Sequence, residues 1–316
     1  MRRVVDALVS ATRARPTGRN TWLGHCPSHE DRRPSLSITL AEDRILLYCF
    51  AGCSVENIVR SVGLEVRDLF GGERERDWTL RLPPEPRREM VPNEEQRAWL
   101  EKLWGETQPI ETSQVALRYL EARGLDPGLI LPDLQRLRFH PSLVYWEEEE
   151  GKVLGEFPAL VARVEHPSCG FVALHRTYLV PDGSGKAPVP SPKKLSKSIF
   201  PGATKGGAIA LYPPGPVLVV AEGIETAFAV RQVTGLPVWA TVNAGGMKAL
   251  LVPEGVRKLL IAADGDPPGI RAAHVLARRA TSMGIRSVVR VPPVPKWDWL
   301  DALLREPLWV RRAWTF

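Results

Sequence analysis

The last third of the chain contains two short apolar runs that end abruptly at acidic residues. Residues 216–221 are apolar up to Glu222, and residues 259–263 are apolar up to Asp264 and Asp266. Aliphatic side chains fill both runs, and no polar residue alternates with them. Runs of this length are typical of strands that are buried on both faces, as in a parallel sheet.

Helical patterns follow both runs, over residues 226–233 and 270–283. This β-α-β-α order predicts an α/β domain with a mostly parallel sheet. The carboxyl ends of parallel strands open onto the functional crevice of such domains, so we expect Glu222, Asp264 and Asp266 at one edge. Like charges disfavour one another, and a hard divalent cation, Mg²⁺ or Mn²⁺, is the usual reason for such a group.

Two close pairs of soft ligands lie near the start of the chain. They are Cys26 with His29, and Cys49 with Cys53. Strand-like residues 35–40 and 44–48 separate the pairs, which matches a structural zinc site in a small zinc-ribbon-like β module. Buried free thiols with an incidental histidine are the alternative. His25 competes as a ligand, but the Cys-x-x-His spacing favours His29. Cys169 is isolated and is expected to be a small core residue.

The middle of the chain mixes helical and strand-like patterns, which predicts an α+β region. Helical spacing covers residues 93–104 and 113–123, and strand-like patterns cover residues 143–146, 157–164 and 170–179. The acidic run 147–150 lies between strands, and we expect it to be a solvated turn.

A glycine-punctuated basic segment follows these strands. Between residues 176 and 207, six basic residues accompany one acid: Arg176, Lys186, Lys193, Lys194, Lys197 and Lys205. A solvated basic loop is the ordinary explanation for such a segment taken alone. Beside a carboxylate–metal site, however, lysine charge and glycine flexibility favour binding of a triphosphate or a nucleic-acid backbone.

Composition and charge narrow the class of protein only moderately. The 316 residues, 44% apolar and 25% charged, are typical of globular proteins, and the net charge of +6 permits a polyanionic partner. No apolar run is long enough to span a membrane, and residues 1–10 predict an amphipathic helix rather than a signal peptide. We therefore expect a cytoplasmic protein whose cysteines bind metal rather than form disulfides.

Pattern changes divide the chain into four expected parts. They are a zinc-binding module over residues 1–70, a Pro/Arg-rich linker over 71–92, a helical and basic part over 93–212, and a catalytic α/β domain over 213–316. The prolines favour an extended linker.

Several of these motifs resemble known families. Glu222-Gly-Ile-Glu-Thr-Ala with Asp264-Gly-Asp266 resembles the Toprim domain of bacterial-type primases, topoisomerases and some nucleases. Cys26-Pro-x-His29-x-Asp31 with the Cys49 and Cys53 pair resembles the zinc-binding domain of bacterial and phage DNA primases. The second pair is one residue longer here than the common Cys-x-x-Cys, a spacing associated with phage and mobile-element members. The basic segment is similar to the RNA-polymerase part of phage and plasmid primases.

The resemblance implies a DNA primase that makes short RNA primers from NTPs on single-stranded DNA. It implies structural Zn²⁺ and two catalytic Mg²⁺ or Mn²⁺ ions held by Glu222, Asp264 and Asp266. Asp298 is the expected further carboxylate, ahead of Asp301. Whether Glu222 binds metal or accepts a proton stays open. The turn at Asn243 and Gly245 is expected to offer backbone N–H groups to a phosphate.

The motifs leave two other functions open, and they also bear on partners. A Toprim nuclease would cut DNA with metal and without NTPs. A zinc-dependent protein that only binds single-stranded DNA would not depend on the acidic residues Glu222, Asp264 and Asp266. The chain has no P-loop, so we expect a separate replicative helicase as partner, in a bacterial cell or a phage-infected host.

Overall fold

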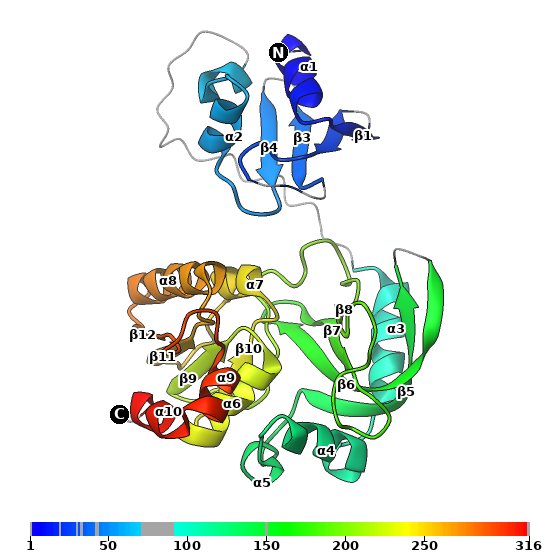
Figure 1. The fold of residues 1–316 in the computed structure, drawn as a ribbon, viewed down its shortest axis with the longest axis vertical. Coiled ribbons are helices and arrows are strands. Elements are labelled where there is room, and N and C mark those ends of the chain that lie inside the picture. The colour runs from blue at the N-terminus through cyan, green and yellow to red at the C-terminus, as the bar shows by residue number, and fades with distance from the viewer. Residues whose placement is uncertain are drawn as a thin grey trace. The chain divides into compact units, whose positions relative to one another are not determined.

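The computed structural model describes residues 2–18, 20–29, 31, 34–41, 44–70, 92–148 and 151–314. The chain divides into two compact units, residues 1–87 and 88–316 (Figure 1). The expected linker, residues 71–92, lies outside the described residues except for Pro92. The finer four-part division remains a prediction.

The first unit is a four-stranded antiparallel sheet with helices. The strands lie in the order β1-β2-β3-β4, with bounds β1 Arg15–Gly18, β2 Thr21–Gly24, β3 Leu36–Leu40 and β4 Ile45–Cys49. Helices α1 (Arg2–Ala11) and α2 (Val55–Ser61) and the 3-10 helix η1 (Val66–Leu69) complete it. The small zinc-ribbon-like β module expected from the sequence is therefore present.

Alternation along β4 separates the two faces of this sheet. Ile45 and Leu47 are buried in one cluster with Leu8 of α1 and Ile58 of α2. The next residue on the strand, Tyr48, is 63% exposed. Successive strand residues point to opposite faces, so the helices pack on one face and the other presents side chains to solvent.

The second unit begins with helices and an antiparallel sheet. The helices are α3 (Glu94–Gly105), the 3-10 helix η2 (Ile110–Thr112), α4 (Gln114–Ala122) and α5 (Pro127–Ile130). The sheet order is β5-β6-β7-β8, with bounds β5 Leu137–Glu147, β6 Lys152–His166, β7 Gly170–Tyr178 and β8 Lys193–Leu195. This is the mixed α+β region that the sequence predicted.

A parallel sheet and its helices complete the second unit. Its order is β10-β9-β11-β12, with bounds β9 Val217–Ala221, β10 Val238–Ala240, β11 Lys258–Ala262 and β12 Arg286–Arg290. All pairings within it are parallel, as predicted. The helices are α6 (Ile224–Thr234), α7 (Ala244–Ala249), α8 (Pro267–Ser282), α9 (Trp299–Arg305) and α10 (Pro307–Ala313).

Helices cover both faces of this sheet, which explains why its strands are continuously apolar (Figure 1). Val219 of β9 lies in one core cluster with Phe228 of α6 and Leu300 of α9. Its neighbour Val220 lies in a second cluster with Leu276 of α8. Each strand residue therefore meets an apolar layer whichever way it points.

Three side chains near these elements are buried or partly buried. Trp299 is fully buried and stacks on Trp309 at 5.8 Å between ring centroids. Cys169 is partly buried against the larger core, which agrees with a packing role. The prediction of a solvated acidic turn is wrong at Glu147, which is 8% exposed, because β5 continues through it and Tyr145 donates a hydrogen bond to it. Glu148 is exposed, and residues 149 and 150 lie outside the described residues.

The turn after β10 also differs from expectation. Asn243 is the N-cap of α7, its Oδ1 accepting a hydrogen bond from the Gly246 N–H at 2.8 Å. The expected glycine turn is thus the start of a short helix, because Asn is a strong capping residue. None of the described helices is long and apolar enough to cross a membrane.

Candidate functional site

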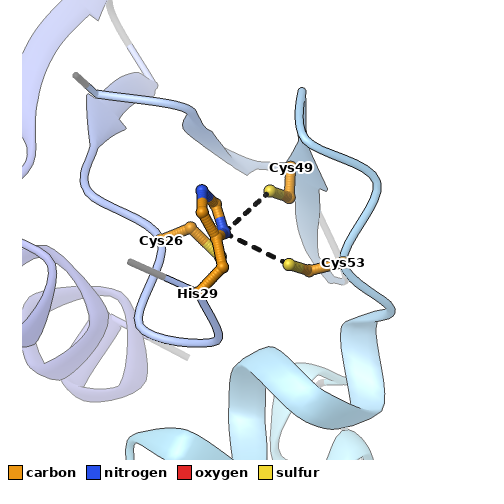
Figure 2. A group of neighbouring side chains, drawn as sticks. All are labelled: Cys26, His29, Cys49 and Cys53. Carbon is orange, nitrogen blue, oxygen red and sulfur yellow. Dashed lines mark hydrogen bonds between the residues drawn. The ribbon is translucent and has the colours of Figure 1, made fainter. Parts of the chain in front are cut away.

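The four zinc-type ligands of the first unit converge on one point. Among the described residues, one ligand atom each from Cys26, His29, Cys49 and Cys53 lie within 4.8 Å of one another. Figure 2 shows the three thiols and the imidazole facing a common centre. The Nδ1 atom of His29 lies 3.2 Å from the Cys53 Sγ and 3.9 Å from the Cys49 Sγ. Three thiols and one imidazole are a donor set that fits Zn²⁺.

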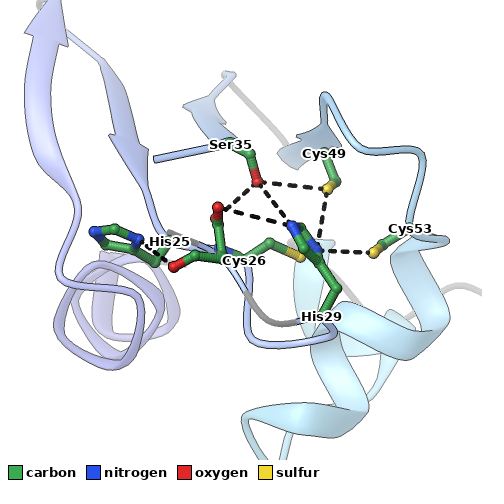
Figure 3. A network of polar contacts seen from close by, with 7 residues as sticks. His25, Cys26, His29, Ser35, Cys49 and Cys53 are labelled. Carbon is green, nitrogen blue, oxygen red and sulfur yellow. Dashed lines mark hydrogen bonds and ion pairs between the residues drawn. The ribbon is translucent and has the colours of Figure 1, made fainter. Parts of the chain in front are cut away.

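The other side of the His29 ring is held by polar groups. Its Nε2 atom lies 3.7 Å from the Asp31 carboxylate and 3.4 Å from the Ser35 hydroxyl. Asp31 also accepts hydrogen bonds from Ser35 and from the Cys26 backbone N–H, both at 2.7 Å. Figure 3 shows Ser35 joining this network to Cys49. Metal-binding histidines are usually oriented by such a carboxylate, which supports His29, and not His25, as the ligand.

Electrostatics within this group also favour a bound cation. Burial raises the pKa of the Cys26 thiol to about 12, against a backbone hydrogen bond from Ser28 that lowers it. A buried thiolate is costly unless a positive charge compensates for it. The four side chains therefore present a site that a thiolate-binding metal would stabilise.

In the second unit, Asp264 lies where the parallel sheet ends and other carboxylates gather. It follows β11 by two residues, and its Oδ1 atom is buried without a hydrogen-bond partner among the described residues. Burial, followed by the negative charges of Glu222, Asp298 and Asp266, raises the pKa of Asp264 to about 7. A buried carboxylate oxygen with no partner, surrounded by oxygen donors, fits a hard divalent cation.

Two of these carboxylates are fixed as helix caps. Asp266 is the N-cap of α8, and its Oδ1 accepts from the Gly269 N–H at 2.7 Å. Asp298 is the N-cap of α9, and its Oδ1 accepts from the Asp301 N–H at 2.8 Å. Asp301 completes a capping box with Asp298. In each residue, one carboxylate oxygen accepts a hydrogen bond from the helix that it caps, and the second oxygen can bind a ligand.

A close approach of two loops brings Asp298 to the Asp264–Asp266 turn. The Gly265 N–H donates to the Trp297 carbonyl at 2.7 Å, and the Lys296 N–H donates to the Gly265 carbonyl at 2.8 Å. A Cβ at Gly265 would lie 2.8 Å from the Trp297 carbonyl oxygen. The glycine between the two aspartates is therefore a requirement of packing.

Glu222 follows β9 and completes the carboxylate group. Burial, then the charge of Asp266, raises its pKa, whereas a hydrogen bond from the Ala244 N–H lowers it. The first backbone N–H of α7 thus donates a hydrogen bond to the Glu222 carboxylate. Asn243 caps that helix and Gly245 is its second residue, so the two flank Ala244. Their role in phosphate binding stays a prediction.

Two of the six expected basic residues reach this region from the basic segment. Lys186 and Lys193 both bind Glu225, the Lys186 Nζ at 2.9 Å from Oε1 and the Lys193 Nζ at Oε2. Glu225 lies in the first turn of α6, three residues after Glu222, so its lysines are held close to the carboxylates. The charge of Lys193 lowers the pKa of both Glu222 and Asp264.

The other four basic residues make different contacts. Lys194 donates to the Trp146 carbonyl at 2.5 Å and lies over the Tyr145 ring at 4.4 Å. Arg176 is half-buried and donates to the Tyr178 hydroxyl at 3.3 Å. Lys197 and Lys205 are exposed. Lys194 points to the opposite face from Lys193 because the two are adjacent on β8.

Three buried polar residues of this region were not anticipated from the sequence. Glu225 and Tyr119 are buried, and the Tyr119 hydroxyl donates to Glu225 at 2.5 Å. Burial, then the charge of Lys193, lowers the pKa of His175 to about 4. Glu225 lies in the first turn of a helix, where an acid is ordinary, so its pairing with distant lysines has no local signal.

Two family models match the second unit. Residues 217–307 match the family described as Toprim domain, and residues 94–206 match one described as Domain of unknown function (DUF7146). The chain therefore contains a Toprim domain, as the motifs around Glu222 and Asp264 predicted. No curated protein matches the chain.

Solved structures that resemble this chain include several primases. The zinc-binding and RNA polymerase domains of the Aquifex aeolicus primase share 17% identity over 98% of this chain and 82% of that chain, with a TM-score of 0.45. A DNA primase domain from Pseudomonas aeruginosa shares 18% over 63% and 71%, with a TM-score of 0.41. The primase fragment of the bacteriophage T7 primase-helicase protein shares 16% over 62% and 72%, with a TM-score of 0.40.

Proposed function

We propose that this protein is a DNA primase, which synthesises short RNA primers from NTPs on a single-stranded DNA template. The observation that carries the proposal is the carboxylate group around the unpartnered oxygen of Asp264, with the Lys193 ammonium beside it. Oxygen donors next to fixed lysines suit a reaction on a metal-bound triphosphate. The Cys₃His group on the same chain supports a template-binding module.

Asp264, Asp266 and Asp298 would hold the divalent cations, with Glu222 as a further ligand or a proton acceptor. Bound Mg²⁺ would polarise the α-phosphate and stabilise the attacking and leaving oxygens. The primer 3′-oxygen forms a bond to the α-phosphorus, the bond from that phosphorus to the bridging oxygen breaks, and pyrophosphate leaves. The hydroxyl proton needs an acceptor, and the raised pKa of Glu222 suits that role.

The exposed face of the zinc module offers a surface for single-stranded DNA. Tyr48 is 63% exposed and Phe50 is 65% exposed, and their rings meet edge to face at 5.2 Å between centroids. Both flank Cys49, so a bound metal would fix their backbone. Exposed aromatic rings of this kind stack on bases without strong sequence preference.

Primer synthesis on single-stranded DNA with labelled NTPs and Mg²⁺ tests this function. The wild type should make short template-dependent oligoribonucleotides. Asp298 and Asp301 supply a matched pair, because both belong to one capping box and Asn preserves a cap at either place. We expect Asp298→Asn to lose about a hundredfold in activity, because even the hydrogen-bond partners of metal ligands contribute about tenfold to a hundredfold, whereas Asp301→Asn should stay near the wild type.

Two results would contradict the primase proposal and identify a rival. Cutting of DNA with metal and without NTPs would indicate a Toprim nuclease. Single-strand binding with no synthesis, unaffected by Asp264→Ala, would indicate a zinc-dependent binding protein.

If primers form, adding the replicative helicase of the host should raise their yield, because primases commonly act beside one.

A further inference from the structure

Glu225 joins three segments that are far apart in the sequence. It lies in the first turn of α6, and its Oε1 accepts hydrogen bonds from the Tyr119 hydroxyl of α4 at 2.5 Å and from the Lys186 Nζ at 2.9 Å. Its Oε2 accepts from the Lys193 Nζ of β8. One carboxylate thus holds two ammonium groups and one hydroxyl.

This carboxylate stays charged although it is almost fully buried. Burial acts to raise the pKa of Glu225, but the charges of Lys193 and Lys186 prevail and lower it to about 2. The Tyr119 side chain is fully buried, and burial followed by the Glu225 charge raises its pKa, so its hydroxyl remains a donor. Buried charges that are paired and hydrogen-bonded in this way are held in one geometry.

The two lysines keep donors for a further ligand. Each ammonium has three N–H groups, and the bond to Glu225 uses one of them. The side chains of Lys186 and Lys193 are 28% and 40% exposed. Two positive charges on one carboxylate leave a surplus of one. Glu225 lies in the first turn of α6, three residues after Glu222, so both ammonium groups are held close to the carboxylate site.

We propose that Glu225 is a positioning residue that holds Lys186 and Lys193 for the β- and γ-phosphates of an incoming nucleoside triphosphate. The inference rests on the proposed function, because it assigns the lysines to that substrate. Lysine is a flexible point charge, and a fixed partner at its amine orients it before the phosphate arrives. Removal of Glu225 should therefore weaken recognition of the outer phosphates more than the chemical step.

Nucleotide binding and primer synthesis by Glu225→Gln test this role. We expect the KM for NTP to rise about tenfold, the size of one lost charge-assisted contact, with kcat changed by less than about threefold. Calorimetry with Mg²⁺ and ATP, ADP or AMP gives a readout independent of synthesis. The wild type should prefer ATP to AMP, and Glu225→Gln should lose most of that preference while binding AMP as before.

Glu165→Gln is the matched control. Glu165 also holds two basic side chains, with its Oε2 at 2.8 Å from the Arg136 Nε and its Oε1 at 3.3 Å from the Arg163 Nε. A purely structural effect of losing such a carboxylate would appear in both variants, and we expect Glu165→Gln to keep the wild-type KM. If Glu225→Gln does not fold, Tyr119→Phe, which removes one bond from the same carboxylate, should raise the KM in the same direction.

The possible failures are distinguishable. Absence of primer synthesis by the wild type contradicts the proposed function. Synthesis by the wild type together with an unchanged KM and an unchanged ATP preference in Glu225→Gln, or in Tyr119→Phe if only that variant folds, overturns the role of Glu225 alone. A further rise in KM when Glu225→Gln is added to the double variant Lys186→Gln/Lys193→Gln would also overturn it, because a residue that acts through these two lysines has no effect left once both are gone.

Discussion

At the scale of single residues, Asp264 combines burial with the charges of three other carboxylates. Its pKa is about 7, against an ordinary value of 3.8. Between these two pH values the carboxyl group is protonated in the folded metal-free protein and ionised in the unfolded chain. Stability therefore falls as the pH rises from about 4 to 7, and the full penalty remains above pH 7. Such a cost is typical of functional sites.

Replacement of this carboxylate should stabilise the protein while it abolishes activity. In Mg²⁺-free buffer at pH 8 we expect Asp264→Asn to unfold at a higher temperature than the wild type, with a gain of at most about 4 kcal/mol. At pH 5 the gain should be less than half as large, because most of the penalty develops between pH 5 and 7. Thermal unfolding at both pH values measures this, and a variant less stable than the wild type at pH 8 would contradict the assignment.

Residue-scale prediction from sequence has a clear limit in this chain. The gathering of Glu222, Asp264 and Asp266 was predictable because they follow the ends of two apolar strands, a purely local pattern. Glu225 was not, because its partners Tyr119 and Lys186 come from other segments of the chain. The burial of Glu147 was also not predictable, because β5 extends to this residue and Tyr145 of the same strand donates a hydrogen bond to it, whereas the local acidic run suggests an exposed turn.

At the scale of elements, the turn after β11 and the start of α9 act as one unit. Gly265→Ala would place a Cβ 2.8 Å from the Trp297 carbonyl oxygen and 3.1 Å from the Val294 carbonyl oxygen. We expect a loss of about 1–3 kcal/mol in unfolding free energy, as overpacking costs, and near-complete loss of primer synthesis because Asp298 moves away. Gly105→Ala is the control, since its Cβ would meet no atom of the described residues within 4 Å. Equal activity of the two variants would refute the coupling.

The exposed face of β4 gives a second prediction at this scale. Tyr48→Ala and Phe50→Ala should each weaken single-stranded DNA binding by about 1–3 kcal/mol, the usual contribution of one stacked base. Leu46→Ala on the same face is the matched control, because Leu46 is 50% exposed but is not aromatic. Fluorescence anisotropy with a labelled oligonucleotide measures the affinities. Equal losses for all three variants would show that stacking is not the mode of binding.

At the scale of the whole molecule, the chain consists of two compact units with different sources of stability. The first has a small core and a Cys₃His group, whereas the second buries two large clusters around its sheets. The apolar runs predicted the parallel sheet correctly, and the strand-like patterns upstream predicted the mixed α+β region. They did not predict how the antiparallel sheet and the parallel sheet share one core, which depends on packing between distant segments.

Loss of zinc should therefore affect the two units differently. We expect chelation, or Cys49→Ser, to unfold the first unit and leave the second folded, because small zinc modules take much of their folding energy from the metal. Limited proteolysis should then degrade residues 1–70 and spare a fragment that begins near residue 93. Equal protection of both units without metal would contradict a structural zinc site.

The central claim is that the Toprim carboxylates and the lysines beside them join nucleotides. Mass spectrometry of the products formed from single-stranded DNA, NTPs and Mg²⁺ tests it most directly. Nucleotidyl transfer predicts oligoribonucleotides with a 5′-triphosphate, complementary to the template, and none with Asp264→Ala. Fragments of the input DNA, or no new oligonucleotide from the wild type with any divalent cation, would contradict it.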